Sequence, residues 1–254
     1  MNDLYLRDQY TNKNIISIFN KTIIEYDIES AGLNLLIKYK LLPEDITDEL
    51  KKLPKKKRVY QIGLLQKKYP GLNKQINDSF KEIRKVFFEE NKLERDDIIS
   101  IKKDAIFVTR EMEHTIFDNV KFKPKNRYTS YINLGSLELY YSEDKLEIKG
   151  LSSEQKKIEC HEEYMIDFIK KYFKKMEYGT KEDQLKFIRN YIDKYKRREL
   201  PLGYYRTFNR DGVYEILDNE DGIIFTDYWD DKKEDLNISY NYNRIFVPFA
   251  KIVL

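Results

Sequence analysis

The run DIISIKKDAIFV (residues 97–108) places the strongest constraint on how this chain can fold. Its β-branched and aromatic side chains favour a buried strand, and Asp104 interrupts them. An ionised carboxylate in such a strand is strongly destabilising unless it is paired with a cation or bound to a metal. The sequence therefore predicts a charged partner or a metal ion for Asp104.

A second acid, Asp27, ends the strand predicted at residues 21–28 (KTIIEYDI). If the two strands are neighbours with their acids on one face, the carboxylates repel each other unless divalent cations lie between them. Mg²⁺ prefers oxygen ligands, and a pair of Mg²⁺ ions can assist phosphoryl displacement. We therefore expect Asp27 and Asp104 to hold two Mg²⁺ ions, with Mn²⁺ as the alternative metal. A turn or cap role for each acid is the competing interpretation.

The hydrophobic periodicity changes several times along the chain. Helices are predicted at 30–42, 43–53, 55–68 and 72–92, and antiparallel strands at 127–150. From residue 153 the pattern is helical, with Gly179 as a stop and Thr180 with Asp183 as a capping pair. A β-meander is predicted at 203–229. The order of these elements indicates an α+β fold.

Composition limits the classes of function that the chain can have. With 254 residues and 41% hydrophobic content it can build a substantial core, and its single cysteine excludes an internal disulfide framework. We expect a cytoplasmic protein without a membrane span, because no apolar run is long enough to cross a bilayer. The acidic segment 211–235 carries ten acids and two lysines, and the remainder is basic. That basic remainder suits nucleic acid, although a solvated lysine-rich surface is an equally weighted explanation.

Four short segments in sequence order resemble motifs of template-dependent polymerases. DIESAGLNLL (27–36) resembles the first palm motif, and SIKKDAIFV (100–108) is similar to the family B DNA polymerase motif YGDTDSIFV, with Asp104 at the metal-binding acid. KNRY (125–128) resembles the KKRY element, and KLEIKGLSSEQ (145–155) the passage from palm to thumb. Lys102 replaces the first acid of YGDTDSIFV, which departs from the pattern.

The resemblance implies roles for further residues. Lys125, Arg127 and Tyr128, with Lys149, would contact a DNA or RNA primer-template. Independently of the resemblance, Tyr128 and Tyr131 are the best-placed of the 21 tyrosines to stack on unpaired bases, and a core or strand-face position is the more common alternative for such tyrosines. In the position of the fingers, Lys56, Arg58 and Tyr60 would bind the nucleoside triphosphate, although the usual spacing is not reproduced. Gly32 stands where many DNA polymerases have a bulky residue that excludes ribose, which favours ribonucleotide incorporation and a primase-like role. The alternative for Gly32 is a purely conformational role in the turn.

The sequence thus predicts a reduced polymerase core of viral or mobile-element origin. A palm-like domain with an antiparallel sheet would span 1–152, with a helical fingers insertion at about 40–95. A thumb-like section of helices and β-meander would span 153–254. Its acidic 211–235 segment is a candidate contact for a replication protein or a segment that opposes nucleic acid, and a solvated hairpin is the favoured alternative to both. Two alternatives remain: a catalytically inactive palm that binds nucleic acid as a replication accessory protein, and an unrelated α+β protein whose motif matches are chance.

Overall fold

The computed structural model describes residues 3–135, 137–150, 159–197 and 199, and the backbone of four short strands between 207 and 225. By the contacts between residues, the chain divides into two compact units. Unit 1 comprises residues 1–15 and 22–128, and unit 2 comprises residues 16–21 and 129–254. The strands after residue 128 therefore group with the C-terminal helices. Both sheets are antiparallel and are combined with helices, so the fold is α+β as predicted.

Unit 1 is built on a sheet with the strand order β1-β4-β5-β3-β7-β6. Its strands are β1 (Gln9–Thr11), β3 (Ile23–Ile28), β4 (Ile98–Lys102), β5 (Ala105–Val108), β6 (Ile116–Phe117) and β7 (Val120–Tyr128). Four helices lie between β3 and β4: α1 (Ala31–Lys38), α2 (Glu44–Lys52), α3 (Lys55–Lys68) and α4 (Leu72–Glu90). Two 3₁₀ turns, Asp3–Leu6 and Arg95–Asp97, complete the unit. The predicted helices in this region are confirmed within a few residues.

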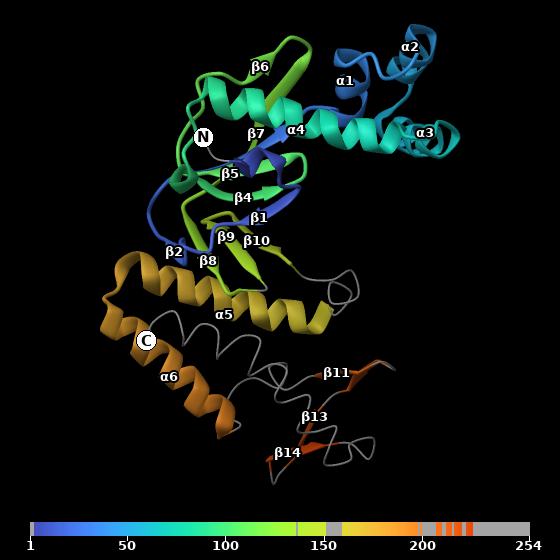
Figure 1. Ribbon diagram of the computed structural model, residues 1–254. Helices are drawn as coiled ribbons and strands as arrows, with labels where there is room; N and C mark the ends of the chain where they lie inside the picture. Colours follow the sequence, from blue (N-terminus) through green and yellow to red (C-terminus); the bar gives the residue numbers. More distant parts are fainter. Residues whose placement is uncertain are drawn as a thin grey trace. The chain divides into compact units, whose positions relative to one another are not determined.

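Helix α4 covers one face of this sheet through an aromatic cluster. Phe87 stacks on Phe122 of β7 with ring centroids 4.2 Å apart, and it also contacts Tyr26 of β3 and Phe117 of β6. Because side chains alternate along a strand, Ile24, Tyr26 and Ile28 join this core. Figure 1 shows α4 running from the sheet toward α1, α2 and α3.

Unit 2 has a smaller sheet in the order β10-β9-β8-β2. Its strands are β2 (Ser17–Ile18), β8 (Ser130–Asn133), β9 (Glu138–Ser142) and β10 (Lys145–Lys149). Helix α5 (Glu159–Tyr178) packs on this sheet through Phe173, whose ring stacks on Tyr141 of β9 at 4.7 Å. Helix α6 (Lys181–Lys196) follows, and β11 (Thr207–Asn209), β12 (Gly212–Tyr214), β13 (Ile216–Asn219) and β14 (Gly222–Phe225) form two hairpins.

The predicted boundary between α5 and α6 is confirmed. Helix α5 ends immediately before Gly179, where a β-carbon would lie 2.5 Å from the Lys175 carbonyl oxygen. At the start of α6 the Asp183 carboxylate accepts hydrogen bonds from the Thr180 amide and hydroxyl, and the Asp183 amide donates to the Thr180 hydroxyl. No helix in the described part of the chain is long and apolar enough to cross a membrane.

Candidate functional site

Asp27 lies near the end of β3, at the centre of the unit 1 sheet. It is paired with Ala105 of β5 on one side and with Lys123 of β7 on the other. Glu25 precedes it by two residues and is 1% exposed, whereas the Asp27 side chain remains 27% exposed. The strand therefore buries its first acid and leaves the second one accessible to a ligand.

Asp104 lies in a turn, which corrects the prediction of one strand over residues 97–108. β4 and β5 form a hairpin in which Lys102 pairs with Ala105, so Lys103 and Asp104 make the two-residue loop. Lys103 has the left-handed backbone conformation (φ 56°) that such tight loops require. The apolar pattern continues through both strands because both are buried, and the polar Lys-Lys-Asp segment marks the turn.

The pairing of β3 with β5 brings the two acids together. The Ile28 amide, next to Asp27, donates a 3.2 Å hydrogen bond to the Asp104 carbonyl. Burial is the main cause that raises the pKa of the Asp104 carboxyl above its usual value, and the negative charge of Asp27 raises it further. Lys125 and Lys103 act in the opposite direction. A cation between these carboxylates would relieve their repulsion.

Lys125 brings a positive charge to Asp27 and Glu25. Opposite the β3 step from Glu25 to Tyr26, β7 has a bulge: Glu25 pairs with Asn126, Tyr26 pairs with Pro124, and Lys125 is the extra residue. Its ammonium group lies 3.0 Å from Asp27 Oδ2 and 3.6 Å from Glu25 Oε1. The hydrogen bond to Asp27 is the main cause that raises the pKa of Lys125. The bulge thus directs a basic side chain onto the acid that was predicted to bind metal.

A buried arginine holds the Lys103–Asp104 turn. Arg84 of α4 is fully buried, and its guanidinium donates to the carbonyl of Lys103 at 2.6 Å and to that of Tyr5 at 2.9 Å. It also forms a 2.8 Å ion pair with Asp8, whose side chain is 47% exposed. Burial is the main cause that lowers the pKa of Arg84, and Asp8 opposes that effect. The position of the turn therefore depends on α4 as well as on the sheet.

The two acids line a cavity of about 440 Å³ within unit 1. Four segments form its wall. These are the end of β3 with the start of α1 (residues 27–33 except Glu29), one face of α3, the α4 residues Ile76 and Phe80, and the Lys103–Asp104 turn. Gly32 lines the cavity and also allows close packing of α1 on α3, since a β-carbon there would lie 3.2 Å from Ile62 Cδ1. Gly32 is inside α1, and Ser30 instead adopts the left-handed conformation of the turn (φ 47°).

The face of α3 decides which basic residues reach the cavity. The lining residues of α3 follow helical spacing: Lys55, Arg58, Val59, Ile62, Gly63 and Gln66. Arg58, predicted from the sequence, also donates a 3.2 Å hydrogen bond to the Ser30 hydroxyl. Lys56 and Tyr60 are exposed outside the cavity, so the structure does not bring them to the two acids. Lys55, Gln66 and Lys103 also line the cavity, but they were not predicted from the sequence. Lys55 lies seven residues before Ile62 and Gln66 four residues after it, so helical spacing places both on the same face of α3 as Ile62.

The residues predicted to contact nucleic acid are dispersed. Arg127 is exposed and forms a 2.7 Å ion pair with Glu111. Tyr128 is 1% exposed with its hydroxyl 3.4 Å from Glu25, and Tyr131 is fully buried, so neither ring offers a free face for stacking. This corrects the prediction that the two tyrosines stack on bases, because both side chains lie on the buried face of their strands. Lys149 belongs to unit 2 and pairs with Glu147.

The donor set for a metal consists of two carboxylates. Among the described residues no group of three or more His, Cys, Asp and Glu side chains is arranged to hold a metal ion. Two acids and a substrate phosphate nevertheless meet the usual requirement of Mg²⁺, which keeps several water ligands. Lys102, which replaces an acid of the polymerase motif, donates a 3.2 Å hydrogen bond to the Thr11 hydroxyl. The side chains of the acidic segment 211–235 lie outside the described residues.

Comparison with known proteins identifies a family for this chain. No curated protein is significantly similar to the chain. Residues 1–253 match the family described as "Bacteriophage PBS1 gene 130 protein", and this description agrees with the expected viral origin. The match covers nearly the full sequence, including both units and the cavity. The chain therefore belongs to the bacteriophage PBS1 gene 130 protein family.

Proposed function

We propose that the unit 1 cavity is the active site of a template-dependent nucleotidyltransferase that requires Mg²⁺. One observation carries this proposal: Asp27 and Asp104, which are distant in sequence, line one cavity together with Lys55, Arg58 and Lys103. Paired carboxylates next to convergent basic side chains suit a metal-bound phosphate substrate. The cavity volume of about 440 Å³ is within the range of sites for small-molecule ligands.

Each part of the cavity has a role in this proposal. Asp27 and Asp104 hold the metal, which when bound would activate the attacking hydroxyl and neutralise the triphosphate. Lys55 and Arg58 bind the β- and γ-phosphates and stabilise the charge on the leaving pyrophosphate. Ile62 and Phe80 provide an apolar wall for the base, and the Lys103 ammonium lies 5.4 Å from the Phe80 ring centroid. With Gly32 in the wall, no side chain at that position collides with a ribose 2′-hydroxyl.

The test is extension of a labelled primer on DNA and RNA templates with Mg²⁺, with dNTPs and NTPs supplied separately. Asp27→Asn and Asp104→Asn should each abolish extension, because each removes a metal ligand. Asp48→Asn is the matched control, since Asp48 is a half-exposed acid of α2 that pairs with Lys51. The proposal fails if the native chain extends no primer, or if the Asp104→Asn variant retains native activity.

A second function is favoured by the position of Lys125. Its ammonium group is 3.0 Å from Asp27 and supplies within the protein the positive charge that a metal would provide. This arrangement suits a palm that has lost catalysis and binds nucleic acid as a replication accessory protein. Such a protein would bind an oligonucleotide equally well with EDTA and with Mg²⁺, and Asp104→Asn would leave that binding unchanged. Metal-dependent extension would exclude it.

A further inference from the structure

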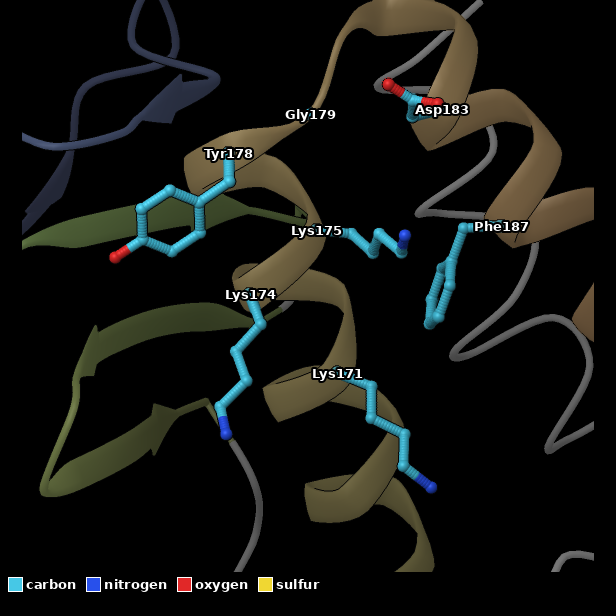
Figure 2. A pocket seen from close by; sticks show the side chains of 7 residues that line it. All are labelled: Lys171, Lys174, Lys175, Tyr178, Gly179, Asp183 and Phe187. Atoms are coloured by element: carbon cyan, nitrogen blue, oxygen red, sulfur yellow. The ribbon is translucent and has the colours of Figure 1, made fainter.

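A second cavity lies within unit 2, between α5 and α6, and has no role in the proposed activity. It has a volume of about 400 Å³ and is lined by Lys171, Lys174, Lys175, Tyr178, Asp183 and Phe187, with Gly179 at the turn. Figure 2 shows Lys175 directed across the gap between the helices toward Phe187, while Lys174 and Tyr178 project from the opposite edge of the α5 face that borders the groove. Basic and aromatic side chains thus line one groove.

Two carboxylates, Asp183 and Asp167, lie near this groove beside its three lysines. Asp183 accepts two hydrogen bonds from Thr180 at the start of α6, and these bonds are the main cause that lowers its pKa. Asp167 pairs with Lys171 at 2.7 Å. No ion pair joins Lys174 or Lys175 to another residue of the described ranges, although the charge of Lys175 helps to lower the pKa of Asp183. The groove therefore keeps a net positive charge that an anionic ligand can neutralise.

The aromatic side chains of the groove differ in exposure. Tyr178 is 89% exposed, so its ring is open to a ligand. Phe187 is partly exposed, and its ring also contacts Phe168 and Tyr191, with centroids 5.7 and 4.8 Å away. That cluster fixes the position of Phe187 at the groove. A planar apolar group of a ligand could therefore stack on either ring without a rearrangement of the core.

We propose that this groove binds single-stranded nucleic acid, with phosphates at Lys174 and Lys175 and bases against Tyr178 and Phe187. The ligand class follows from the combination of side chains. Lysines at helical spacing can follow a phosphate backbone, and aromatic rings bind unpaired bases without regard to sequence. In a duplex the base faces are stacked on each other and are not accessible to these rings. This binding requires neither a metal nor the unit 1 cavity, so it is independent of the proposed catalysis.

The test is fluorescence anisotropy of a labelled oligothymidylate strand with the full chain in EDTA. Lys174→Glu combined with Lys175→Glu should weaken binding by at least roughly tenfold, and should flatten the dependence of affinity on salt because two phosphate contacts are lost. Lys181→Glu combined with Lys186→Glu changes the charge equally at positions of α6 outside the groove, and should change affinity by less than about twofold. Equal losses in both double variants, or no binding by the native chain, would overturn the proposal.

The stacking contribution needs its own variants. Tyr178→Ala and Phe187→Leu should each weaken binding on the order of fivefold or more, since each removes a ring face. Tyr178→Ala cannot act through folding because the side chain is exposed, and circular dichroism melting checks Phe187→Leu. As a competitor, tripolyphosphate should displace the strand far less well than unlabelled oligothymidylate at equal phosphate concentration. Displacement by both to the same extent would mean that bases contribute nothing, and the proposal would fail.

Discussion

Replacing Arg84 with methionine tests how the hairpin turn that carries Asp104 is held. The guanidinium makes three hydrogen bonds, to the carbonyls of Tyr5 and Lys103 and to the Asp8 carboxylate. A hydrogen bond of a charged group contributes about 1.5 to 3 kcal/mol net, so the two bonds to backbone carbonyls give roughly 3 to 6 kcal/mol. Asp8 is half exposed and can be rehydrated after the substitution, so the lower end applies. We expect a loss of about 3 kcal/mol.

Hydrogen exchange measured by mass spectrometry can detect this loss in the hairpin itself. For peptides from β4 and β5, a loss of about 3 kcal/mol in the free energy of opening corresponds to exchange roughly 150-fold faster. Arg95→Met is the matched control, because the Arg95 side chain is exposed and the hydrogen bond described for it is a long one, 3.4 Å, to the Tyr10 hydroxyl. Its exchange should change by about twofold at most.

Equal rates of amide exchange in β4 and β5 of the Arg84→Met and Arg95→Met variants would refute the prediction. In that case the cost of burying the guanidinium would equal the strength of its hydrogen bonds. A slower rate in β4 and β5 than in the native chain would go further, since it would mean that the buried arginine destabilises the turn. Faster exchange in β9 and β10 alone, within unit 2, would place the effect in a unit that Arg84 does not contact, and would also contradict the prediction.

Three further predictions concern the unit 1 cavity. Because the pKa of Asp104 is raised in the folded state, its ionised form destabilises the fold and stability falls as pH rises above the unfolded value of 3.8. Asp104→Asn should therefore melt at a higher temperature than the native chain at pH 7, with the difference vanishing below that value. Gly32→Ala should be nearly neutral in urea unfolding, because helix propensity offsets the 3.2 Å approach to Ile62, whereas Gly32→Val should cost about 1 to 3 kcal/mol. Lys125→Met removes a half-exposed ion pair with Asp27, so this variant should bind Mn²⁺ about fivefold more tightly than the native chain when measured by titration calorimetry. An unchanged affinity would show that Lys125 does not compete with the metal for Asp27.

Local sequence determined most of the elements. The helices from α1 to α4 follow from apolar spacing and from the prolines between them, because these signals act over one or two helical turns. Gly179 and Thr180 define the α5–α6 junction in the same way, since the tight turn excludes a β-carbon and the hydroxyl caps the next helix. The sequence also indicated Asp27 and Asp104 as unusual, because each is an acid at the edge of an apolar run.

Contacts between distant segments decided the rest of the site. Residues 97–108 resemble one strand because both strands of the hairpin are buried and apolar, and only the short polar Lys-Lys-Asp segment between them marks the turn that the pairing of Lys102 with Ala105 closes. Lys125 faces Asp27 only because β7 has a bulge opposite β3, and a bulge depends on the pairing of two strands. The packing of α3 places Ile62 close to Gly32 of α1, and in this orientation Lys55 and not Lys56 lines the cavity. The sequence alone thus determined which side chains can bind a metal or a phosphate, and tertiary packing decided which of them lie together. The reason is that a shift of one residue in strand register, or a rotation of a helix by one residue, moves a side chain to another face.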